Sequence, residues 1–215
     1  MRPLIHEEGK NPSDISRKDE VFVSFSGLIT IAGGKLTGYR KMADKVVTLV
    51  MEHLDINNQE GYGVCQTATL PLSGGDVGGS EQFDAFVEQQ IQSGVVLGMT
   101  EAEARKVART YGSNTPLLYE LLEGINERQD EGALPLPLLG ALLYGMEHEM
   151  TVTPVDFFMR RTGMLLFNVR EVQQWKKVVI QYMATYLHWS HEQAEQYQTE
   201  LEQYLGEASQ HEIYS

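Results

Sequence analysis

Two glycines, a lysine and a threonine stand close together at Gly33, Gly34, Lys35 and Thr37, directly after a β-branched run. Glycines let the backbone turn sharply and let a ligand approach closely. A helix that begins at such a turn presents unpaired N–H groups and the positive end of its dipole. With the Thr37 hydroxyl and the Lys35 charge, this turn is suited to bind an anion or an electron-rich carbonyl group.

The spacing of this turn differs from that of common phosphate-binding loops. The pattern GxxxxGK[ST] does not occur, because Leu36 separates Lys35 from Thr37, and GxGxxG does not occur either. A simpler interpretation therefore stays open. In it the segment is a tight strand-to-helix turn, with Thr37 as a helix cap and Lys35 in solvent.

The elements around the turn can be predicted from residue type. Segments 21–25 and 28–32 are rich in β-branched and aromatic residues, with the turn signal Ser26-Gly27 between them. We expect a β-hairpin or two sheet strands there. A helix is predicted over 35–54, because four apolar residues recur at helical spacing: Met42, Val46, Leu49 and Val50.

Beyond a glycine-rich connection at 55–79, helix signals continue almost to the end of the chain. Capping boxes begin at Thr100 and at Ser190. The other predicted helices begin near Ser80 (as a cap), Thr115, Pro135, Thr153 and Val169. The helix at Thr115 is expected to bury four leucines: Leu117, Leu118, Leu121 and Leu122. The predicted fold is therefore mainly α, with a C-terminal α-helical bundle.

Charge divides the 215-residue chain into two regions. Residues 1–54 hold eight Lys or Arg against seven Asp or Glu, which gives +1, whereas residues 55–215 hold nine against 23, which gives −14. The total of −13 argues against a nucleic-acid partner, because phosphate repels such a surface. A single cysteine excludes an intrachain disulfide and suits a reducing compartment. No metal site is predicted, since His188 and His191 lack a third ligand at useful spacing.

The segment IAGGKLTGYRKMA at 31–43 resembles the late flavin-binding motif of FAD-dependent, quinone-linked (aerobic) glycerol-3-phosphate dehydrogenase. The segments RPL at 2–4 and DISR at 14–17 are similar to two steps that precede this motif in the family. TPVDFFMRRT at 153–162 is similar to part of its C-terminal helical domain. The order of these motifs makes the match more specific than any one of them.

The resemblance implies that the chain is the C-terminal portion of such an enzyme. Residues 1–54 would be the last strands and last helix of the FAD-binding α/β domain, 55–79 a linker and 80–215 the helical C-terminal domain. The cofactor would be FAD, and the family's βαβ unit with its GxGxxG turn is missing from the sequence. The resemblance places five residues against the flavin: Gly33, Gly34, Lys35, Leu36 and Thr37.

The implied reaction is hydride transfer from C2 of sn-glycerol 3-phosphate to flavin N5, which forms dihydroxyacetone phosphate and passes electrons on to quinone. Arg2, Arg17 and Lys35 would bind the substrate, because guanidinium forks suit a phosphate. The base that takes the hydroxyl proton would lie in the missing FAD domain, so no catalytic residue is assigned in this fragment, which should be inactive alone. The implied location is cytoplasmic, and a homodimer and peripheral contact with the inner face of the cell membrane stay open.

A second hypothesis treats the chain as a stand-alone acidic helical protein-interaction module. The two hypotheses differ in what they require of the strands at 21–32. In a fragment, these strands have lost their sheet partners and should be exposed or paired with a second copy. In a stand-alone module, they should form a hairpin packed on the bundle.

Overall fold

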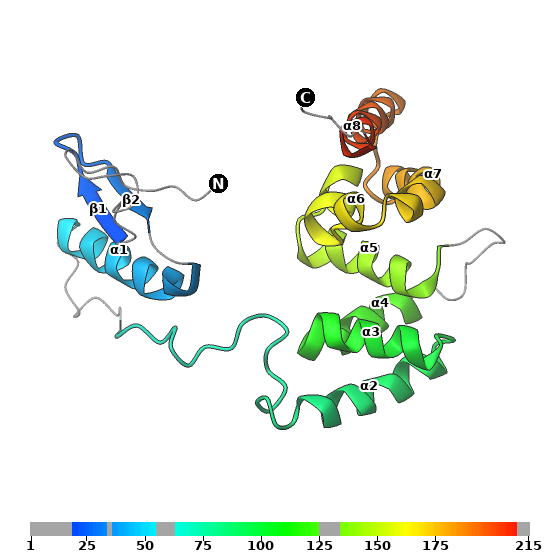
Figure 1. Ribbon diagram of the computed structural model, residues 1–215, viewed down its shortest axis with the longest axis horizontal. Coiled ribbons are helices and arrows are strands. Elements are labelled where there is room, and N and C mark those ends of the chain that lie inside the picture. Colours follow the sequence, from blue (N-terminus) through cyan, green and yellow to red (C-terminus); the bar gives the residue numbers. More distant parts are fainter. Residues whose placement is uncertain (1–18, 34–35, 55–62, 125–133, 210–215) are drawn as a thin grey trace, which may run out of the picture. The chain divides into compact units, whose positions relative to one another are not determined.

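The computed structural model describes residues 19–33, 36–54, 63–124 and 134–209. The chain divides into two compact units, which we call the hairpin unit (Met1–Leu70) and the helical unit (Pro71–Ser215). In the described residues, the hairpin unit contains a β-hairpin and a long helix, and the helical unit contains the later helices (Figure 1). The predicted mainly α fold is confirmed.

The hairpin unit contains strands β1 (Asp19–Val23) and β2 (Ile29–Gly33), which pair antiparallel. The turn between them closes through a hydrogen bond from the Ser24 N–H to the Leu28 carbonyl (2.9 Å). Gly27 in this turn has φ of +84°, a backbone conformation that glycine adopts without steric cost. The predicted hairpin is therefore confirmed.

Helix α1 (Tyr39–His53) follows a single 3₁₀ turn at Leu36–Gly38. It therefore begins later than the predicted start near Lys35. The reason is local, because Gly38 is a poor helix former and 3₁₀ turns are frequent at helix N-termini. The four apolar residues predicted for its inner face are each half-buried: Met42, Val46, Leu49 and Val50.

The helical unit is built from seven α-helices in the described residues, with a π-helical turn at Asp156–Arg161 before α6. Their bounds are α2 (Phe83–Val96), α3 (Glu101–Tyr111), α4 (Thr115–Glu123), α5 (Leu136–His148), α6 (Met164–Phe167), α7 (Val169–Tyr186) and α8 (His191–Ser209). The predicted helical bundle is thus present in the structure.

Two helix starts, those of α3 and α8, are capped as the sequence predicts. The Thr100 hydroxyl accepts a hydrogen bond from the Glu103 N–H (3.3 Å), and the Glu103 carboxylate accepts one from the Thr100 N–H (2.9 Å). The same reciprocal pair forms between Ser190 and Gln193. Ser80 was expected to cap α2, but that helix begins at Phe83 and its N-cap side chain makes no capping hydrogen bond.

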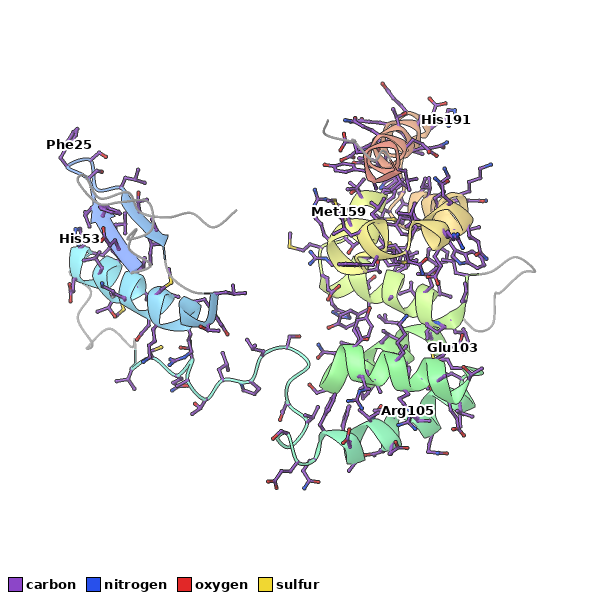
Figure 2. The ribbon with its side chains drawn as sticks, viewed as in Figure 1. Phe25, His53, Glu103, Arg105, Met159 and His191 are labelled. Atoms are coloured by element: carbon purple, nitrogen blue, oxygen red, sulfur yellow. The ribbon has the colours of Figure 1, made fainter. Side chains whose placement is uncertain are left out.

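Small residues let the helices pack closely. A Cβ added at Gly94 of α2 would lie 2.6 Å from the Ala104 Cβ of α3 and 2.7 Å from the Tyr119 hydroxyl oxygen. On the outer side of the same pair, Arg105 of α3 forms an exposed ion pair with Glu88 of α2, and Figure 2 labels this arginine. The core is completed by fully buried side chains from the later elements: Leu118, Leu142, Phe157, Phe158, Val172, Met183 and Leu201.

Polar contacts connect the later helices to one another. The Tyr186 hydroxyl of α7 donates to the Glu147 carboxylate of α5, and this bond together with partial burial raises the pKa of Tyr186 to about 12. Lys176 of α7 pairs with Glu202 of α8, and only 14% of the lysine side chain is exposed. These contacts, beside the buried apolar side chains, make the last helices part of one packed unit.

Candidate functional site

The candidate site is the turn between β2 and α1. Gly33 ends β2 and pairs with Asp19 at the end of the hairpin, and Leu36 and Thr37 form the 3₁₀ turn that leads into α1. The structure therefore brings these three predicted residues into one short connection. The other predicted site residues lie outside the described residues: Arg2, Arg17, Gly34 and Lys35.

The N-terminus of α1 is open. Its N-cap residue is Gly38, which has no side chain to accept hydrogen bonds from the first turn, so Thr37 does not act as the cap. Leu36 is 89% exposed, and Thr37 is exposed as well. Because the first backbone N–H groups of a helix have no intrahelical acceptor, they can donate to an electron-rich group placed at this turn.

The charged residues at this helix start also favour an anionic ligand. The first turn of α1 contains no acidic residue, whereas Arg40 and Lys41 fall within it. Cations at a helix N-terminus are unfavourable against the macrodipole, so this arrangement suits a bound anionic group better than an empty helix end. The sequence did not single out these two residues, because the predicted helix start near Lys35 placed them beyond the first turn.

The segment after α1 returns to this first turn within the hairpin unit. The Arg40 Nη1 lies 3.5 Å from the Thr67 Oγ1, and the Cys65 Sγ lies 3.0 Å from the same hydroxyl oxygen. Cys65 is an exposed free thiol. These contacts are local and polar, and they leave the turn accessible.

The hairpin unit has no apolar core of its own in its described residues. Every buried hydrophobic side chain in the structure belongs to the helical unit, and α1 has no buried residue. Phe25 at the hairpin tip is fully exposed and points away from the strands (Figure 2), and Phe22 is 47% exposed. Since an isolated two-stranded hairpin is marginal in water, this surface is suited to packing against further protein.

Other candidate residues in the helical unit have structural partners. Arg160 pairs with Asp156, and the Arg161 Nε lies 4.0 Å from a Glu149 carboxylate oxygen. His191 lies 3.4 Å from the Glu195 carboxylate. Within the described residues, no three His, Cys, Asp or Glu side chains are grouped closely enough to hold a metal ion. No helix in the described part of the chain has the length and apolarity needed to cross a membrane.

Comparison with known proteins identifies the chain's relatives. It is 46% identical over 200 residues to the aerobic glycerol-3-phosphate dehydrogenase of Bacillus subtilis (strain 168), covering 93% of this chain and 36% of that protein. It is also 46% identical over 208 residues to the enzyme of the same name from Staphylococcus aureus (strain USA300), covering 97% of this chain and 37% of that protein. The chain thus spans little more than a third of these relatives, and it matches their C-terminal part.

A solved structure agrees with these relatives. The X-ray structure of the glycerol-3-phosphate dehydrogenase from Bacillus halodurans, complexed with FAD, matches with a TM-score of 0.78 and 45% sequence identity. The match covers 86% of this chain and 36% of that one. The predicted resemblance is confirmed, and the stand-alone module is not favoured.

A family match covers more than half of the chain. Residues 65–194 match the family described as the C-terminal domain of alpha-glycerophosphate oxidase. This range runs from the end of the hairpin unit to the start of α8. The chain belongs to this family.

Proposed function

We propose that the chain is the C-terminal part of an FAD-dependent glycerol-3-phosphate dehydrogenase, which oxidises sn-glycerol 3-phosphate to dihydroxyacetone phosphate. The observation that carries this proposal is the 46% identity to aerobic glycerol-3-phosphate dehydrogenases over 93% and 97% of the chain. The exposed apolar surface of the hairpin unit supports it, because that surface needs a further part of the protein to cover it.

The turn between β2 and α1 fits the edge of a flavin ring. The uncapped first turn of α1 offers backbone N–H donors, and Arg40 and Lys41 add positive charge. Bound there, FAD would supply the acceptor for a hydride from C2 of the substrate. The residues that would hold it are Gly33, Gly34, Lys35, Leu36 and Thr37. Backbone N–H donors at this turn would stabilise negative charge at the ring edge.

The substrate phosphate would be bound by the basic residues near the start of the chain. Arg2 and Arg17 can each present a planar pair of donors to phosphate oxygens, and Lys35 can add a point charge. The group that takes the substrate hydroxyl proton would belong to the part of the enzyme that precedes this chain. The 215-residue chain alone is therefore expected to be inactive.

The same resemblance supports a quinone as electron acceptor and a cytoplasmic location. The proposal also includes two further partners, the inner face of the cell membrane and a second copy of the chain. The first turn of α1 and the hairpin surface would both face the rest of the FAD-binding domain, which completes the sheet.

Titration with FAD tests whether this chain contains only part of the FAD-binding site. We expect no saturable change in flavin fluorescence with the 215-residue chain. The full-length enzyme should bind FAD and reduce an artificial electron acceptor when glycerol 3-phosphate is added. Saturable binding by the chain alone would contradict the fragment hypothesis. A full-length protein that binds FAD but does not oxidise glycerol 3-phosphate would contradict the proposed assignment of the substrate.

A charge placed in the turn tests the predicted flavin contact. In the full-length enzyme, Leu36→Asp puts a carboxylate among donors that would face the electron-rich ring edge, so FAD affinity should fall about tenfold or more. Leu70→Asp is the matched control, because Leu70 is also largely exposed (68%) but lies outside the turn. Flavin content after purification and circular dichroism are the measurements. Equal FAD affinity in the two variants would remove Leu36 from the site.

A further inference from the structure

A short turn before the first helix of the helical unit is attached to a corner formed by two other helices. We call residues Ser73, Gly74, Gly75 and Asp76 the clasp. The clasp begins with a tight turn, in which the Gly75 N–H donates to the Leu72 carbonyl (2.7 Å). It then lies against the junction between α3 and α4, which consists of the 3₁₀ turn Gly112–Asn114.

Three hydrogen bonds join the clasp to this corner. The Ser113 N–H donates to the Gly74 carbonyl (3.0 Å), and the Asp76 N–H donates to the Ser113 hydroxyl (3.3 Å). The Asn114 side-chain amide donates to the Ser73 hydroxyl (2.8 Å). Both ends of the clasp, Ser73 and Asp76, are thus hydrogen-bonded to residues that lie about 40 positions later in the sequence.

Two glycines make this contact closer than side chains would allow. A Cβ added at Gly112 would lie 2.0 Å from the Gly74 carbonyl oxygen, and one added at Gly74 would lie 2.7 Å from the Tyr111 carbonyl oxygen. Both glycines also have positive φ, +51° at Gly112 and +82° at Gly74. The two backbones therefore meet in an interlock that only glycine permits at both positions.

Burial begins only at the clasp. Residues 63–73 are all exposed, including Leu70 (68%) and Leu72 (72%). Within the clasp only Gly74 is half-buried, and Val77, which follows the clasp, is half-buried as well. The family match begins at residue 65, upstream of the clasp and of α2. The clasp therefore lies inside the range that matches the family rather than ahead of it.

We infer that the clasp is a built-in anchor that ends the connection between the two units at the α3–α4 corner. The helical unit then starts at the clasp, not at the first helix. We therefore expect the chain from Ser73 to Val77 to be held against the α3–α4 corner, unlike residues 63–72. This anchor is a conformational device of the fold, and it is independent of which substrate the full enzyme oxidises.

Limited proteolysis of the 215-residue chain tests the anchor. Proteinase K cuts after aliphatic residues, and suitable residues lie on both sides of the proposed boundary: Ala68 before the clasp, and Val77 directly after it. Cleavage after Val77 should be about tenfold slower or more than cleavage after Ala68, because cutting there requires the clasp to open. Equal rates at these sites in the wild-type chain would overturn the inference.

Variants at the corner show whether the clasp causes this protection. Gly112→Ala should bring the rate at Val77 close to that at Ala68, whereas Gly206→Ala, where an added Cβ meets nothing within 4 Å, should leave it unchanged. If tryptophan fluorescence shows that Gly112→Ala unfolds the helical unit, the double variant Ser73→Ala/Ser113→Ala decides instead. It removes two of the three bonds and should speed cleavage after Val77 severalfold. An unchanged rate there would overturn the inference.

Discussion

Replacing Phe158 by alanine should lower the free energy of unfolding of the helical unit by about 3–5 kcal/mol. Phe158 is 0% exposed, and its ring packs edge-on against Phe157 with centroids 5.1 Å apart. Truncation removes a large buried apolar surface and leaves a cavity that a packed core cannot fully close. Urea unfolding followed by tryptophan fluorescence is the measurement, because both tryptophans, Trp175 and Trp189, lie in the helical unit.

Phe167→Ala is the matched control for this variant. It is the same change on the neighbouring helix α6, but Phe167 is 88% exposed. Its effect on the unfolding free energy should stay within about 0.5 kcal/mol. Similar losses in the two variants would mean that burial of Phe158 in the core is not what stabilises this region.

The sequence predicted elements well where a local signal fixes them. The hairpin followed from residue type and Ser26-Gly27, and α3 and α8 followed from their capping boxes. Within α4, the predicted inner face was only partly right, since Leu118 is fully buried but Leu117 is 38% exposed. Spacing indicates a face, but the width of that face depends on the neighbours that cover it.

Elements that depend on tertiary contacts were not predicted. The four-residue helix α6 follows Gly163, which has φ of +66°, and nothing in its short sequence separates it from a loop. The segment after Thr153 was predicted as an ordinary helix, yet it contains the π-helical turn Asp156–Arg161. An α-helix and a π-helix share nearly the same pattern, so the difference arises from side-chain bonding and packing.

At the candidate site too, the features set by the local sequence were predicted, and those that depend on the rest of the structure were not. The turn after β2 was predicted from its glycines and from the helix that follows. Arg40 and Lys41 were not singled out, because their position in the first turn depended on where α1 begins. The groups that would face this turn lie outside the described residues or outside the chain. The local sequence could therefore indicate a binding turn, whereas the identity of the ligand, FAD, was inferred from the resemblance to the family.

The π-helical turn depends on one carboxylate. Asp156 Oδ2 accepts hydrogen bonds from the backbone N–H groups of Val152 (3.2 Å) and Thr153 (3.0 Å), and its other oxygen pairs with Arg160. Only 17% of the Asp156 side chain is exposed. Its removal would leave these donors without an acceptor at the start of the turn that carries Phe157 and Phe158.

Asp156→Ala should therefore destabilise the helical unit by about 2–3 kcal/mol at pH 7. The loss should depend on pH. Partial burial raises the pKa of Asp156, but the hydrogen bonds from Val152, Thr153 and Arg160 outweigh burial and hold the pKa below its usual value of 3.8. A carboxylate with a lowered pKa stabilises the fold above its unfolded pKa, and that stabilisation is lost as the pH falls through the folded pKa.

Urea unfolding at pH 7, 5 and 3 measures this dependence. The gap between the wild-type chain and Asp156→Ala should be equal at pH 7 and 5, and smaller at pH 3, where protonation of Asp156 begins to weaken the wild-type contacts. Asp84→Ala is the control, since Asp84 also pairs with an arginine, Arg109 (3.2 Å), but is 85% exposed; its cost should be below about 1 kcal/mol. A gap that stays constant down to pH 3 would show that the Asp156 charge does not hold the π-helical turn, and that packing of Phe157 and Phe158 alone maintains it.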